Sequence, residues 1–79
     1  MIPPPPKIWP GADGAPLSCR EKLKMLAENH AELAQTLRDT FEDAILMGVD
    51  EAALRAILTG MVAGLDSPKR AAGQQPPGS

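Results

Sequence analysis

A helical spacing of apolar residues runs through residues 18–47, which contain neither glycine nor proline. On a helical wheel these positions share one stripe about 120° wide, and charged residues occupy the opposite side. The stripe comprises Cys19, Leu23, Leu26, Ala27, His30, Leu33, Ala34, Leu37, Phe41, Ala44 and Ile45. The alternating steps of three and four that define a heptad seam link Leu23, Leu26, His30, Leu33 and Leu37. The pattern predicts a long amphipathic helix over residues 18–47, roughly 45 Å in length.

Both ends of this helix carry residues that favour a helix boundary. Ser18 and Glu21 stand at the two positions of a capping box, in which each side chain bonds the other residue's backbone amide. Gly48 follows the last turn, where glycine readily takes the left-handed conformation that ends a helix. We therefore expect the helix to be capped at Ser18 and to stop before Gly48.

A second, shorter helix is predicted over residues 50–65. Asp50 is a good N-cap, and Pro68 restricts the residues before it, so the helix ends shortly before Pro68. Its large apolar residues form one stripe, Leu54, Ile57, Leu58, Met61, Val62 and Leu65. Small residues form a second stripe, Ala53, Ala56, Gly60 and Gly64. The short connection between the two helices favours an antiparallel helical hairpin.

The two ends of the chain are rich in proline and glycine. Residues 3–6 are four consecutive prolines, which favour an extended polyproline II segment because proline restricts φ and lacks a backbone donor. We expect residues 1–17 and residues 66–79 to be disordered tails. The predicted fold is therefore all-α, a two-helix antiparallel hairpin between two tails.

The predicted hairpin is too small to bury all of its apolar surface. Some fifty foldable residues lie near the lower size limit for an independently stable domain. The second helix is about half as long as the first, so we expect the stripe over residues 19–33 to face water. A homodimer forming a four-helix bundle, or a larger partner protein, would cover this surface. The residues predicted to form the interface are Leu23, Leu26, His30, Leu33, Ala56, Gly60 and Gly64.

Charge and composition narrow the classes of partner. The formal net charge is −2, so no overall positive field attracts nucleic acid. Three basic residues lie near the start of the first helix, Arg20, Lys22 and Lys24. The alternative function is therefore a small nucleic-acid-associated regulator that binds through this basic cluster. No apolar run reaches the ~20 residues of a membrane span, and no secretory leader is recognised at the N-terminus. We expect a cytoplasmic protein that does not insert into membranes.

Three residues have more than one interpretation. His30 is either a partly buried polar residue, a register-setting residue at a dimer interface or, least supported by its neighbours, a metal ligand. Cys19 is the only cysteine; the start of a helix lowers thiol pKa values, yet no convincing base accompanies it, which favours a structural or incidental role. Trp9 either folds back on the first helix or forms a short motif that another protein recognises.

The sequence contains no phosphate-binding glycine loop, catalytic triad or convergent set of metal ligands. We predict no catalytic residue, no metal, no cofactor and no small-molecule substrate. The predicted function is a small non-enzymatic protein-interaction module (an adaptor, an assembly factor or a regulator) that acts through an apolar helical surface.

Overall fold

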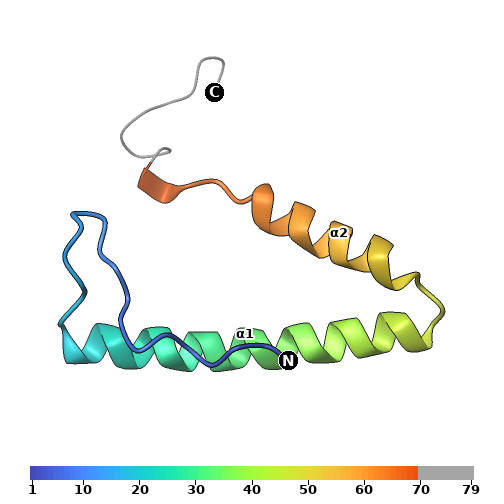
Figure 1. Ribbon diagram of the computed structural model, residues 1–79, viewed down its shortest axis with the longest axis horizontal. Helices are drawn as coiled ribbons and strands as arrows, with labels where there is room; N and C mark the ends of the chain where they lie inside the picture. Colours follow the sequence, from blue (N-terminus) through green and yellow to red (C-terminus); the bar gives the residue numbers. More distant parts are fainter. Residues whose placement is uncertain (70–79) are drawn as a thin grey trace, which may run out of the picture. The chain divides into compact units, whose positions relative to one another are not determined.

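The computed structural model describes residues 1–69. It contains two helices, α1 (Arg20–Leu46) and α2 (Glu51–Ala63), joined by a short turn (Figure 1). No strand occurs in this part of the chain, so the predicted all-α class is confirmed and the element order agrees with a helical hairpin. The predicted bounds of 18–47 and 50–65 exceed the observed ones by one or two residues at each end. Most of the predicted second tail, residues 70–79, lies outside the described residues.

The N-cap of α1 is Cys19 and not Ser18. The Leu23 amide donates to the Cys19 carbonyl oxygen at 3.0 Å, and the residue whose carbonyl accepts the first helical bond is the N-cap. The predicted capping box at Ser18 is therefore wrong by one residue. Just before the helix, the Leu17 amide donates to the Trp9 carbonyl oxygen at 2.9 Å and closes the turn over residues 9–17.

The C-terminus of α1 confirms the predicted role of Gly48. This glycine has a φ of 101°, and its amide donates to the Ile45 carbonyl oxygen at 3.0 Å. The Val49 amide reaches back to the Ala44 carbonyl oxygen, also at 3.0 Å. These two bonds make up a Schellman motif, which satisfies carbonyl groups that the helix end would otherwise leave unpaired.

Asp50 caps the N-terminus of α2, as its residue type predicts. Its backbone is extended, with φ −62° and ψ 133°, and its Oδ2 atom accepts a hydrogen bond from the Ala53 amide at 2.9 Å. Glu51 follows in the first turn, where a negative charge interacts favourably with the helix dipole. At the other end the Gly64 amide still donates to the Gly60 carbonyl oxygen at 3.0 Å. The N-cap bond of Asp50 thus accounts for the start of α2 at Glu51.

The chain divides into two compact units, Met1–Asp43 and the part from Ala44 onward, and each is described by itself. In the first unit, residues 9–17 form a closed turn with an antiparallel bridge between Pro10 and Pro16. The Gly11 amide donates to the Ala15 carbonyl oxygen at 2.7 Å, and a Cβ atom on Gly11 would lie only 2.6 Å from that oxygen. A side chain at Gly11 is therefore incompatible with this turn. Disorder of residues 1–17 in solution stays a prediction.

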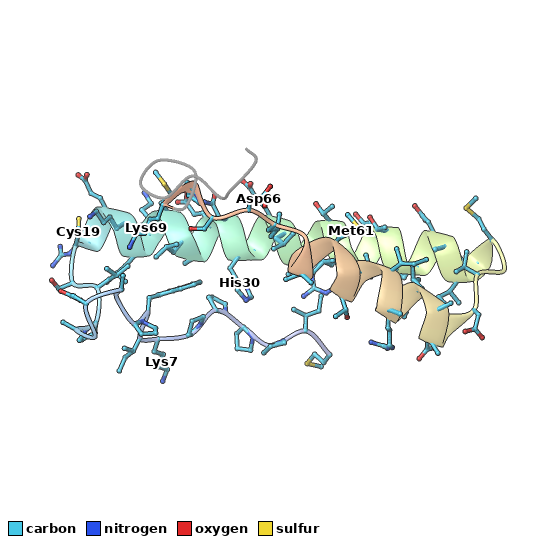
Figure 2. All side chains as sticks on the ribbon, turned by 90° about the horizontal axis from the view of Figure 1, so that it is seen from above. Lys7, Cys19, His30, Met61, Asp66 and Lys69 are labelled. Atoms are coloured by element: carbon cyan, nitrogen blue, oxygen red, sulfur yellow. The ribbon has the colours of Figure 1, made fainter. Side chains whose placement is uncertain are left out.

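The N-terminal segment of this unit partly covers the apolar stripe of α1. Figure 2 shows His30 pointing from α1 toward the segment, whereas the Lys7 side chain points away from the helix. The segment contributes the half-buried residues Ile2, Pro5, Trp9 and Leu17. The half-buried residues on the facing stripe are Leu23, Leu26, Ala27, His30, Leu37 and Phe41. Ala34 on the same stripe is buried, with 5% of its surface exposed.

The lengths of the two facing segments agree. Residues 2–9 span roughly 22 Å at the polyproline rise of ~3.1 Å per residue. Residues 23–37 of α1 span about 21 Å at ~1.5 Å per residue. The expectation that the stripe over residues 19–33 faces water is therefore wrong for Leu23, Leu26 and His30. It is correct for Cys19 and Leu33, which remain exposed.

Candidate interaction surface

The large apolar residues near the end of α2 are more exposed than Leu54 near its start. Leu54 near its start is buried, with 6% of its surface exposed, and Leu58 is half-buried. The four that remain, here called the α2 apolar face, are Ile57, Met61, Val62 and Leu65, with exposed fractions of 58%, 65%, 68% and 76%. Ile57 and Met61 are neighbours one turn apart on α2. Val62 follows Met61 in the last turn, and Leu65 lies just beyond the C-cap Gly64, so the four residues are grouped at the C-terminal end of α2.

Contiguity distinguishes this patch from the isolated Met25, whereas Leu46 and Met47, 85% and 83% exposed, adjoin each other at the end of α1. Met25 on α1 is 62% exposed, nearly as much as Met61. Its neighbours one turn away are all polar, namely Glu21, Lys22, Glu28 and Asn29. A single exposed apolar residue needs no explanation, whereas a contiguous patch marks a binding surface or an aggregation hazard. Residues 56–65, which include the patch, contain no charged residue.

The small residues of α2 lie open beside this patch. Ala53, Ala56, Gly60 and Gly64 are all exposed. A Cβ atom built on Gly60 would meet nothing within 4 Å. Glycine in a helix interior costs about 1 kcal/mol relative to alanine, and nothing in the described part of the chain requires its small size here. No other described segment packs against Gly60.

The structure distributes the predicted interface residues over both units. Trp9, Leu23, Leu26, His30 and Leu33 belong to the first unit, and Ala56, Gly60 and Gly64 belong to the second. Trp9, Leu23, Leu26 and His30 are half-buried, whereas Leu33 is 60% exposed. The sequence analysis placed the α2 part of the interface on the small residues and did not include the α2 apolar face. The uncharged run over residues 56–65 is the signal that pointed to it.

Cys19 occupies the N-cap of α1 and is exposed (Figure 2). A hydrogen bond from the Lys22 backbone amide is the main cause that lowers the pKa of this thiol below its usual value. Desolvation acts against this bond, and the Glu21 amide and the Lys22 charge act in the same direction as it. The sequence has one histidine, His30, which lies about three turns further along α1. A thiolate favoured by a helix start, without an adjacent base, does not make a catalytic centre.

The basic cluster at the start of α1 is interrupted by acidic groups. Lys24 Nζ lies 3.9 Å from Glu28 Oε1, and both side chains are largely exposed. Glu21 stands between Arg20 and Lys22 in the sequence. An exposed pair of this kind contributes little stability, but it offsets positive charge that phosphate groups would require.

The described residues contain no group of three or more His, Cys, Asp or Glu side chains that could hold a metal ion. Neither of their helices combines the length and the apolar character needed to cross a bilayer. Comparison with known proteins finds no matching family model, no matching curated protein and no matching solved structure.

Proposed function

We propose that this chain is a non-enzymatic protein-interaction module and that the α2 apolar face binds its partner. The observation that carries the proposal is the group formed by Ile57, Met61, Val62 and Leu65, each more than half exposed in the last two turns of α2 or just beyond its C-cap. A protein surface of similar apolar character is the partner that such a patch fits, because the face carries no charge for phosphate or for a charged small ligand.

The energy available from this face alone does not exceed the cost of association. Burying a side chain of this size completely contributes about 1.5–3 kcal/mol, so covering four that are about two-thirds exposed contributes roughly 4–8 kcal/mol. Association costs an estimated 4–15 kcal/mol in lost translational and rotational freedom. The partner must therefore contribute apolar surface of its own.

The open small-residue stripe supports the same assignment. Gly60 weakens α2 as an isolated helix, and a partner that approaches the backbone closely would compensate for this cost. The homodimeric four-helix bundle expected from the sequence belongs to this proposal as one form that the assembly takes. In that form each chain supplies two helices.

Site-specific photocrosslinking tests the proposal with a matched control. A benzophenone amino acid replaces Met61 in one variant and Met25 in another, two methionines with almost equal exposure. After irradiation in an extract of the source cells, we expect protein adducts of the Met61 variant and few of the Met25 variant. Equal labelling at the two positions, or no adduct at Met61, would refute a role for the α2 apolar face.

A further inference from the structure

Three of the four consecutive prolines near the N-terminus are exposed, namely Pro3, Pro4 and Pro6. We infer that residues 3–7 are a polyproline II ligand for a second protein, whose binding groove is lined by aromatic side chains and rimmed by acidic ones. This ligand is separate from the α2 apolar face, and its binding does not depend on that face. The burial period of the segment, its free carbonyl groups and the charge of Lys7 lead to this partner.

Burial along the segment has a period of three residues. Proline restricts φ to the polyproline II value, and that helix has three residues per turn, so residues three apart share an edge. Ile2 and Pro5 share one edge, and both are half-buried. The two other edges consist of exposed residues, Pro3 with Pro6 and Pro4 with Lys7. One edge is thus partly covered, and two edges face solvent.

The polyproline geometry extends no further than Lys7. Ile8 would continue the edge of Ile2 and Pro5, but it is 69% exposed, and the chain bends at residues 7 and 8. Directly after the bend, the Trp9 carbonyl oxygen accepts the bond from the Leu17 amide that closes the following turn. This turn anchors the C-terminal end of the segment, which reduces the freedom that the segment loses when a partner binds.

Exposed proline rings and free carbonyl groups are the features that aromatic-lined grooves recognise. In SH3, WW and EVH1 domains a Pro-x-x-Pro segment docks between aromatic side chains. Pro3 and Pro6 have this spacing on one exposed edge. Within residues 1–69, no hydrogen bond involves residues 1–8. Their carbonyl oxygens are therefore available to the tyrosine hydroxyl and tryptophan N–H donors of such a groove.

Lys7 adds an unpaired positive charge beside the prolines. Its side chain is exposed and points away from α1 (Figure 2). No ion pair among the described residues includes it, and the first acidic residue of the sequence is Asp13. An acidic rim on the groove would therefore attract the segment, and salt would weaken this attraction.

Titration of the full chain with purified proline-binding domains, followed by calorimetry, tests the inference. The probes are one SH3, one WW and one EVH1 domain, each with acidic residues at the rim of its groove. We expect at least one of them to bind, and the double substitution Pro3→Ala and Pro6→Ala to raise its dissociation constant at least tenfold. Pro68→Ala removes an exposed proline elsewhere and should leave the constant unchanged. Binding by none of the three domains, or equal binding by the double variant, would overturn the inference.

Two further comparisons test the assigned edges and the charge. Pro5→Ala should raise the dissociation constant less than Pro6→Ala, because these adjacent prolines differ in exposure and not in their effect on the backbone. Equal losses would overturn the assignment of the exposed edge. Lys7→Glu should weaken binding more at low salt than at high salt, whereas Lys69→Glu makes the same charge change outside the segment and should have little effect. Equal effects of the two lysine substitutions would overturn the acidic rim.

Discussion

Whether Gly60→Ala raises or lowers the Tm tests if any part of the chain packs against this side of α2. Gly60 lies inside a helix, where replacing glycine by alanine stabilises by about 0.8–1 kcal/mol if the new methyl group meets no obstacle. The ideal Cβ position at Gly60 has nothing within 4 Å, so the full gain is expected in the isolated chain. For a domain of this size, 1 kcal/mol shifts the unfolding midpoint by about 4–8 °C. Gly60→Ala should therefore raise the Tm by roughly 4 °C or more in dilute solution.

The same substitution should weaken the homodimer included in the proposed function. A methyl group at Gly60 keeps a second helix further away, so the dissociation constant measured by light scattering should rise although the monomer has become more stable. Thermal unfolding followed by circular dichroism at low concentration isolates the monomer effect. A decrease of Tm in dilute solution would refute the reasoning, because it would mean that some part of the same chain packs against Gly60.

Gly48→Ala is the matched control for the backbone argument. Its Cβ position is equally free of neighbours, but its φ of 101° lies in the left-handed region, which costs an ordinary residue about 1–2 kcal/mol. One substitution at two open glycines should thus change the Tm in opposite directions. A rise at both positions would contradict the role of Gly48 in the Schellman motif.

Three further measurements follow from the contacts described above. Asp50→Ala removes the acceptor of the Ala53 amide and should cost about 1 kcal/mol, read as a lower Tm, whereas Asp50→Ser should retain most of the stability and an equal loss would contradict capping. Trp9 is the only tryptophan of the sequence and is half-buried, so unfolding in urea should shift its fluorescence to longer wavelength; an unchanged spectrum would contradict its burial. The thiol pKa of Cys19 is lowered, so its alkylation by iodoacetamide should reach half-maximal rate at a lower pH than in the urea-unfolded chain, and coincident profiles would contradict the amide contacts. Because the folded pKa lies below the unfolded one, the associated stability is fully present above about pH 9.0 and is lost as the pH falls through the folded pKa.

The features that sequence reasoning predicted correctly depend on short stretches of chain. Gly48 ends α1 because a left-handed residue satisfies the Ile45 and Ala44 carbonyl groups at once, and glycine takes that conformation at the least cost. Asp50 starts α2 because its carboxylate reaches an amide three residues ahead. The apolar period of residues 18–47 is sufficient to predict a long helix, but it does not identify the residue at which the helix begins.

Two features differ from what the sequence indicates. Ser18 has the right chemistry for a cap, yet the N-cap is the next residue, Cys19, whose carbonyl oxygen accepts the first helical bond from the Leu23 amide. The sequence left open whether Trp9 folds back on the first helix. It did not indicate that the proline-rich segment before Trp9 lies along α1, because that segment has no helical or strand period.

The sequence by itself determined the fold class, the approximate bounds of both helices and the residues that separate them, because hydrophobic period and capping chemistry act within a few residues. Only the tertiary structure decided which apolar residues remain uncovered. Leu54 and Met61 belong to the same stripe of α2, yet one is buried and the other is two-thirds exposed. Burial is a property of what lies in the surrounding space, and the spacing of residues along one helix cannot specify it.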